Sequence, residues 1–143
     1  MTVESTTRVM DDYLDALAKR EDFSRFFADD IVWTTTETSD TVRGREAVRD
    51  FIVAFHTQTF EASMDVKALT VCDGHATLEA DFVGQHAGEF AGIAATGARL
   101  RVPYCVCYDV DDSGITALRA YLPIAKMVSE VTEAAEHGVP AAP

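Results

Sequence analysis

The chain has 143 residues, a length that fits one domain able to bury about two thirds of its unfolded surface. Hydrophobic residues make up 48% and charged residues 25%, which is a globular composition and excludes a disordered or collagen-like chain. The formal net charge of -12 repels nucleic-acid phosphates and anionic lipid surfaces, so we expect no nucleic acid and no membrane among its partners.

The sequence shows no signal for export or membrane insertion. No apolar run approaches the roughly 20 residues that span a bilayer, and the N-terminal segment MTVESTTRVMDD lacks the basic and apolar regions of a secretory signal. We therefore expect a cytoplasmic protein.

Three cysteines, Cys72, Cys105 and Cys107, are an odd number of thiols. The last two are one residue apart within a predicted strand, where they close no standard disulfide, and no histidine pair accompanies them at zinc-ligand spacing. We expect reduced, mostly buried thiols and no metal site.

The first part of the chain predicts helices around one strand. Residues 7–19 form an amphipathic helix with one apolar stripe, made by Val9, Met10, Tyr13, Leu14 and Leu17. Residues 21–30 predict a short helix, and residues 31–37 a strand with one face made by Ile31, Trp33, Thr35 and Glu37. A further helix follows Gly44, and His56 ends its apolar stripe.

The second part alternates at the period of strands. Residues 62–71 and 76–86 predict a hairpin around the turn CDGH, and residues 99–110 and 115–124 predict two more strands. Pro103 places the third of these strands at an edge or a bulge. After Ser129 the periodic pattern gives way to Ala, Gly and Pro, so we expect residues 132–143 to be a disordered tail behind a single domain of residues 1–131.

Helices therefore come first, one more follows the first strand, and strands meander to the end. This order predicts an α+β fold with helices segregated to one face of a strongly curved antiparallel sheet, which encloses a pocket.

Residues 84–97 read GQHAGEFAGIAATG, which resembles the G-T-H-x-G-x-F-x-G-I-P-A-T-G-R signature of the SnoaL-like polyketide cyclases. These ester cyclase-like proteins belong to the nuclear transport factor two-like superfamily. The resemblance implies a cone-shaped α+β barrel, a hydrophobic small-molecule ligand, no cofactor and a homodimer.

The resemblance also implies a reaction. Family cyclases close rings by intramolecular aldol chemistry, with an aspartate on the last strand as general acid and base in a motif like R-x-Y-x-D. In this chain the corresponding residues 119–123 read RAYLP, so Pro123 stands at the aspartate position. Two functions stay open: cofactor-free aldol cyclisation or isomerisation of a hydrophobic oxygenated substrate, and a non-catalytic ligand-binding or dimeric interaction module.

His86, Arg119 and Tyr121 are the candidate catalytic residues. His86 shares the strand parity of Phe82 and is expected to face inward, where an imidazole with a reference pKa near 6.5 can act as acid or base. The resemblance places Arg119 and Tyr121 in the cavity, where they would orient a substrate oxygen. The alternatives are a hydrogen-bonded core histidine and a last-strand face that is wet or covered by a dimer partner.

The predicted pocket wall combines large side chains with a few polar groups: Tyr13, Trp33, Glu37, His56, Phe82 and Tyr104. Tyr108 is a further residue of this kind. Glu37 is the leading carboxylate if the acid/base group has moved from the usual position. For His56 the alternative is a helix C-terminal histidine that binds free carbonyls.

Overall fold

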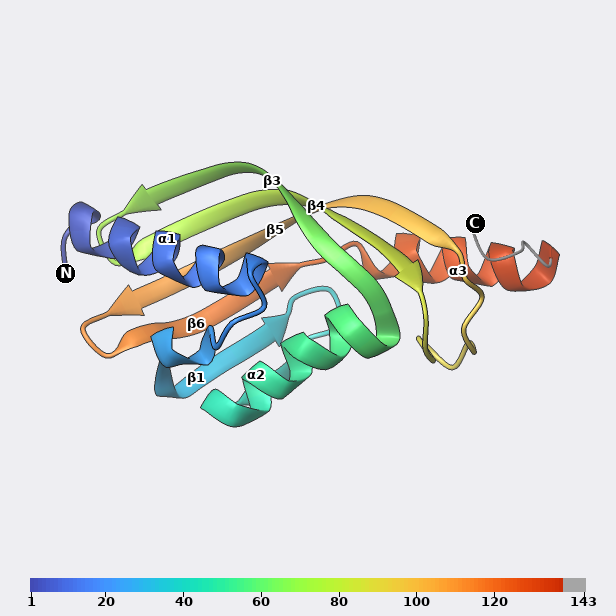
Figure 1. Cartoon of the computed structure of the whole chain (residues 1–143), viewed down its shortest axis with the longest axis horizontal. Helices are drawn as coiled ribbons and strands as arrows, with labels where there is room; N and C mark the ends of the chain where they lie inside the picture. Colours follow the sequence, from blue (N-terminus) through green and yellow to red (C-terminus); the bar gives the residue numbers. More distant parts are fainter. Residues whose placement is uncertain (138–143) are drawn as a thin grey trace.

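The computed structural model describes residues 1–137; residues 138–143, which include the end of the predicted tail, lie outside the described residues. In chain order (Figure 1) the elements are α1 (Val3–Ala18), the 3-10 turn η1 (Ser24–Phe26), β1 (Phe27–Thr35), β2 (Asp40–Arg43), α2 (Arg45–Ala54), the π-helical turn η2 (Phe55–Thr59), β3 (Phe60–Cys72), β4 (His75–His86), β5 (Arg99–Asp111), β6 (Gly114–Tyr121) and α3 (Ile124–His137).

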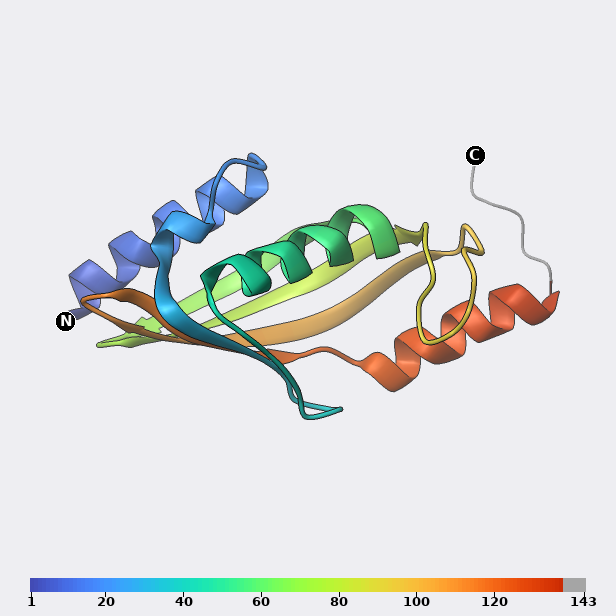
Figure 2. The ribbon, with the colours of Figure 1, turned by 90° about the horizontal axis from the view of Figure 1, so that it is seen from below.

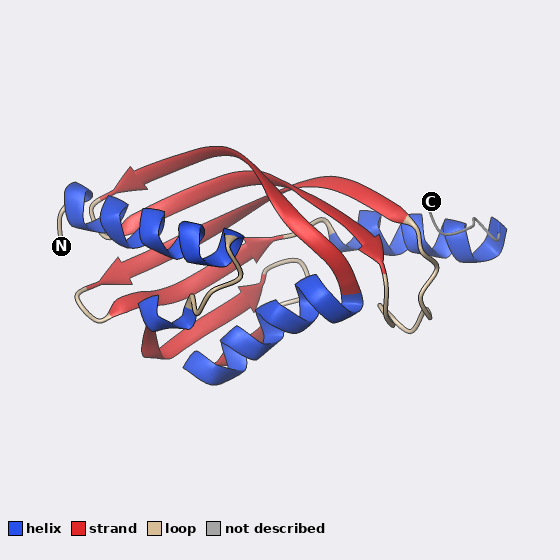
Figure 3. Cartoon of the chain, viewed as in Figure 1, coloured by secondary structure: helices blue, strands red, loops and turns tan. Residues whose placement is uncertain are grey.

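The strands form one six-stranded sheet in the order β2-β1-β6-β5-β4-β3 (Figure 3). The β3–β4, β4–β5 and β5–β6 pairs are antiparallel, as predicted, but β1 pairs with β6 in parallel. The sheet is therefore mixed. It is strongly curved and does not close into a barrel, because β2 and β3 remain as its two edges. The α+β class is confirmed.

Two helices, α1 and α2, lie over the same face of the sheet, which we call the inner face (Figure 2). The strand alternation explains why they pack there: the buried side chains of β5 are Leu100, Val102, Val106, Tyr108 and Val110, and their sequence neighbours are less buried. A core of apolar side chains from both helices and from the middle of the sheet holds these two layers together.

The prediction of a disordered tail is wrong for residues 132–137, which form the C-terminal part of α3. Met127, Val131 and Ala134 lie on one side of this helix and are buried. Met127 and Val131 belong to a second apolar cluster with Phe60, Ala62, Phe82, Leu100 and Val102. Burial of this stripe stabilises a helix that the small residues of the sequence did not reveal.

The cysteine prediction is half right. All three cysteines are free thiols, but none is buried: Cys72 is exposed, and Cys105 and Cys107 are half-buried on the outer side of β5. Among the helices of residues 1–137, none is both long and apolar enough to cross a bilayer.

Candidate functional site

An open cleft lies between the C-terminal end of α1, the end of α2 and the first half of β3. Its volume is about 410 Å³. A much smaller inner chamber of about 30 Å³ lies deeper, against the inner face of the sheet. Leu17, Ile52, His56 and Met64 line both spaces, so the cleft and the chamber adjoin at these four side chains.

The chamber wall is mainly apolar and aromatic. Inward-facing positions of three neighbouring strands supply Phe82 from β4, Tyr104, Val106 and Tyr108 from β5, and Leu118 and Ala120 from β6. The helical side and β1 add Tyr13, Leu17, Trp33, Ile52, Phe55 and His56. Five of the six predicted wall residues thus come together: Tyr13, Trp33, His56, Phe82 and Tyr104.

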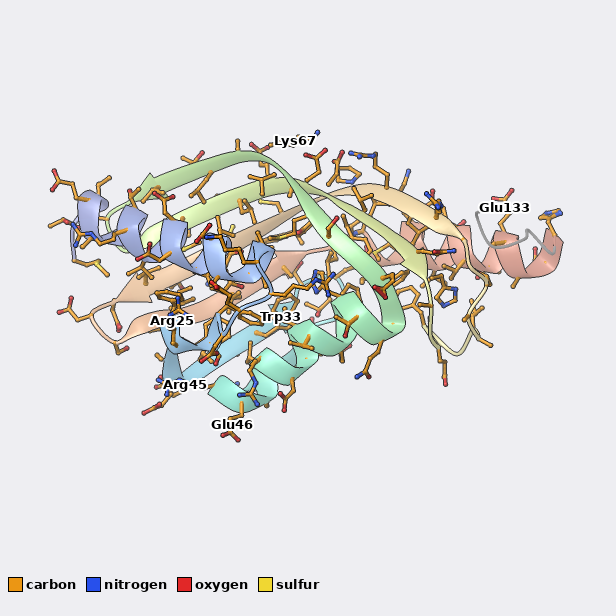
Figure 4. All side chains as sticks on the ribbon, in the orientation of Figure 1. Arg25, Trp33, Arg45, Glu46, Lys67 and Glu133 are labelled. Atoms are coloured by element: carbon orange, nitrogen blue, oxygen red, sulfur yellow. The ribbon has the colours of Figure 1, made fainter. Side chains whose placement is uncertain are left out.

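Trp33 forms a fixed part of this wall. Its indole Nε1 donates a hydrogen bond to Thr35 Oγ1 at 2.9 Å, and its ring packs on Phe51 with ring centroids 5.1 Å apart. Figure 4 shows Trp33 in the interior between α2 and the sheet, whereas Lys67 points outward from β3. Because its only donor is already bonded, Trp33 offers a ligand apolar surface and no polar contact.

Three phenols, those of Tyr13, Tyr104 and Tyr108, provide the chamber's hydrogen-bond donors. Burial raises the pKa of each, and neighbouring phenols raise the pKa of Tyr13 and Tyr108 further. All three are therefore neutral donors near pH 7. None of these hydroxyls is hydrogen-bonded to another residue in the described part of the chain. A ligand oxygen in the chamber would supply the missing acceptor.

His56 stands where cleft and chamber meet, at the start of the π-helical turn η2. Its Nδ1 lies 2.8 Å from the Ile52 carbonyl oxygen and donates to it, which leaves the lone pair on Nε2. Nε2 has no hydrogen-bond partner among the described residues. Burial lowers the pKa of His56 and the nearby positive charge of Arg20 lowers it further, although the bond to Ile52 acts in the opposite direction. The imidazole is therefore a neutral base near pH 7.

The predicted place of Glu37 in the pocket is wrong. The inward alternation of β1 ends at Thr35, and Glu37 lies in the exposed turn that follows. Its Oε2 accepts a hydrogen bond from the backbone N–H of Ala125 at 2.8 Å. Glu37 therefore satisfies a free N–H in the first turn of α3 and lies outside the cavity wall.

His86 faces inward, as predicted, but it does not line the cavity. It is only 1% exposed, and its Nδ1 accepts the backbone N–H of Thr96 at 3.2 Å and contacts Thr96 Oγ1 at 2.9 Å. Phe60, which pairs with His86 across the β3–β4 ladder, packs against its ring. The structure favours the core-histidine alternative: His86 anchors the loop of residues 87–98.

The predicted inward orientation of Arg119 and Tyr121 is also wrong. A bulge in β6 is the cause: Ile115 pairs with Val110, whereas Ala117 pairs with Asp109, so Thr116 is an extra residue. This insertion reverses the parity of the strand. Leu118 and Ala120 therefore face the chamber, and Arg119 and Tyr121 point to the opposite side.

On that opposite side Arg119 and Tyr121 have other surroundings. The Arg119 guanidinium binds the Asp109 carboxylate through two hydrogen bonds of 2.7 and 3.0 Å, and this pairing lowers the pKa of Asp109. Tyr121 is 49% exposed. Pro123, which holds the aspartate position of the family motif, does not line the cavity.

Sequence reasoning missed Arg20, Glu21 and Met64, which line the cleft. Met64 lay within a predicted strand and carried a usable parity signal. Arg20 and Glu21 lie in the turn after α1, and no pattern in the sequence predicts which way their side chains point. Within residues 1–137, no three side chains of His, Cys, Asp or Glu gather closely enough to hold a metal ion.

Helices and a curved sheet that enclose an aromatic pocket define this chain as an α+β protein with a cone-shaped fold. Residues 6–125 match the sequence model of the SnoaL-like polyketide cyclase family. The chain belongs to this family, as the segment of residues 84–97 predicts.

Solved structures share the fold at low sequence identity. A protein from Jannaschia sp. CCS1, classed as a SnoaL-like polyketide cyclase, has a TM-score of 0.81 at 15% identity over 92% of this chain and 94% of its own. One from Xanthomonas campestris pv. campestris, classed as a polyketide cyclase, has a TM-score of 0.78 at 19% identity over 90% and 98%.

A third structure, from Kribbella flavida DSM 17836, is classed as a ketosteroid isomerase. Its TM-score is 0.64 at 20% identity, over 86% of this chain and 82% of its own. At these identities the likeness establishes the fold alone. No curated protein sequence is significantly similar to the chain.

Proposed function

We propose that this protein catalyses cofactor-free proton transfer at a carbon next to a carbonyl group, as in aldol cyclisation or isomerisation, on a hydrophobic oxygenated substrate. His56 is the base, in place of the carboxylate that the family motif would put at Pro123. The observation that carries the proposal is the 2.8 Å bond from His56 Nδ1 to the Ile52 carbonyl, which fixes the basic lone pair on Nε2 at the entrance of the chamber.

The proposed step uses groups that the chain itself supplies. His56 Nε2 removes a proton from the carbon beside the carbonyl, and the C–H electron pair moves onto the carbonyl oxygen to form an enolate. Phenolic hydroxyls of the chamber stabilise the enolate oxygen by hydrogen bonds. In a cyclisation, the enolate carbon attacks a second carbonyl, the electron pair of that carbonyl moves onto its oxygen, and protonated His56 returns its proton to this alkoxide. In an isomerisation, His56 returns the proton to another carbon of the enolate.

The alternative is a pocket that holds such a ligand without converting it. The apolar wall and unbonded phenols would serve this function equally well, and Pro123 at the aspartate position favours it. Proton exchange separates the two functions, since only a catalyst labilises the C–H bond.

The test uses 2-tetralone, a bicyclic ketone, in deuterated buffer. Proton NMR follows the loss of its α-protons, and calorimetry measures its binding. We expect the wild-type protein to accelerate exchange and His56→Gln to lose about a hundredfold or more of that acceleration, because a positioned base contributes about this factor. His75→Gln is the matched control, since His75 is partly exposed and pairs with Asp109 away from the cavity.

A second arm tests the donors. Tyr104→Phe removes one chamber hydroxyl and is expected to slow exchange with little change in affinity, whereas Tyr121→Phe alters the opposite side of the sheet and is expected to change neither. Binding of the ketone without exchange would support the binding-protein alternative. Unchanged exchange in His56→Gln would remove His56 from the mechanism.

A further inference from the structure

We propose that the ligand of this pocket carries a carboxylate, and that Arg20 binds it at the mouth of the cleft while the apolar part fills the cleft and its carbonyl oxygen reaches the chamber. This inference rests on the proposed function, because it concerns the same pocket. It adds a substrate class: amphipathic carboxylic acids.

Arg20 occupies a backbone position that normally belongs to glycine. Lys19 is the C-cap residue that follows α1, and Arg20 after it takes a left-handed conformation with φ of 56°. Its N–H bonds to the Leu17 carbonyl at 3.2 Å, and the N–H of Glu21 bonds to the Ala16 carbonyl at 2.9 Å. These two bonds define a Schellman motif with Arg20 at the C′ position, where a side chain is unfavourable. An arginine at such a position indicates a use for its side chain.

The guanidinium of Arg20 points toward the cleft. Its Nη2 donates to the carbonyl oxygen of Ala62 at 3.3 Å, and both residues line the cleft together with His56. Arg20 also contributes to the lowered pKa of His56, so its charge reaches the proposed base. The sequence therefore brings a cation from the end of α1 to the entrance that a ligand would pass.

Arg20 has no carboxylate partner among the described residues, in a chain with 24 acidic and 12 basic residues. Arg45, Arg49, Arg101 and Arg119 each form an ion pair with an aspartate. Arg8, Arg25 and Arg43 form none within residues 1–137, but unlike Arg20 they do not line the cleft. A guanidinium has five N–H donors, and Arg20 uses one of them in a long bond. The remaining donors suit the two oxygens of a carboxylate.

Glu21 lines the same cleft but forms no ion pair with Arg20. Its negative charge, together with the net charge of -12, opposes a doubly charged phosphate more strongly than a singly charged carboxylate. The mouth of the cleft therefore favours a carboxylate over a phosphate, and Arg20 would bind the carboxylate through two hydrogen bonds.

The test compares two probes with the same ring system, 2-naphthylacetic acid and its neutral methyl ester, by calorimetry on the full chain. The ester reports the apolar pocket, and the ratio of the two affinities reports the Arg20 subsite. We expect the wild-type protein to prefer the acid by about tenfold. Arg20→Gln is expected to abolish this preference by weakening acid binding far more than ester binding, while Arg20→Lys restores part of it.

Two neighbouring variants complete the design. Lys19→Gln removes the same charge one residue away, where the side chain pairs with Asp15 outside the cleft, and is expected to keep the preference for the acid. Glu21→Gln is expected to increase that preference. Equal affinities for acid and ester in the wild type, or an undiminished preference in Arg20→Gln, would overturn the Arg20 assignment alone. If neither probe bound, the pocket proposal itself would fail.

Discussion

His56 performs two tasks with one imidazole ring. The helix-terminal interpretation is correct for Nδ1, which satisfies the Ile52 carbonyl, and the pocket interpretation is correct for the ring as a whole, which lines the cavity. The hydrogen bond to the Ile52 carbonyl holds the proton on Nδ1, so the lone pair of Nε2 is free to act as a base in the cavity. A structural hydrogen bond thus prepares the proposed base.

The pH dependence of exchange follows from the direction of the His56 pKa. Burial and the Arg20 charge place this pKa below the usual value of 6.5. Since the neutral form is the base, the exchange rate is expected to decline as the pH falls, with its midpoint below pH 6.5. Glu21 and the phenols of the chamber are the other polar groups near His56. Burial raises the pKa of the Tyr104 phenol, so this group stays neutral over the same pH range.

Removal of the Arg20 charge provides the check on that profile. Arg20→Gln is expected to move the decline to higher pH, because a neutral side chain no longer opposes protonation of the imidazole. Rate profiles and NMR titration of the His56 ring measure the same midpoint. A midpoint that stayed in place or moved to lower pH would contradict the electrostatic link between the two residues.

The end of α1 shows a conflict between folding stability and the proposed binding role of Arg20. We expect Arg20→Gly to stabilise the protein by about 1 kcal/mol, because glycine adopts the left-handed conformation without the steric cost of a Cβ. The same variant is expected to lose the preference for the acid probe. Chemical denaturation measures the first effect and calorimetry the second.

Lys19→Gly is the control for this prediction. Lys19 has an ordinary helical φ of -83°, so glycine there is expected to destabilise the protein by roughly 1 kcal/mol. If Arg20→Gly also destabilised the protein, the side chain of Arg20 would contribute more to folding than its backbone strain costs.

Alternation predicted the orientation of most strand residues, and the failures have local physical causes. It identified the inward faces of β4 and β5 because those strands run without interruption through the chamber wall. The placement of Arg119 and Tyr121 in the cavity came from the family resemblance and not from alternation. The bulge at Thr116 exchanges the two faces of β6, so these side chains point away from the chamber. Parity also says nothing about distance along a strand, so His86 was assigned to a cavity that ends nearer Phe82.

The whole molecule is a two-layer cone with one uncovered side (Figure 2). Helices α1 and α2 cover the inner face, and no helix of residues 1–137 covers the middle of the opposite face. Composition and element order predicted this layering, because amphipathic helices and alternating strands must bury one face each. The family signature added the cone shape. Neither revealed α3, whose stability depends on contacts with distant strands.

The uncovered face leads to a prediction about assembly. Tyr121 is 49% exposed there, beside the half-buried Cys105 on the neighbouring strand. We expect a homodimer formed through this face, and we expect Tyr121→Glu to weaken it by replacing a large, half-exposed aromatic side chain with a charge. Light scattering coupled to size exclusion measures the mass. A wild-type monomer at all protein concentrations would contradict this expectation.

The most direct test of the account is α-proton exchange from 2-tetralone at saturating ketone, with wild-type protein and His56→Gln compared at equal occupancy of the pocket. We expect rapid exchange in the wild type and a loss of about a hundredfold or more in the variant, with affinity retained. Equal exchange rates at equal occupancy would contradict the assignment of His56 as the base.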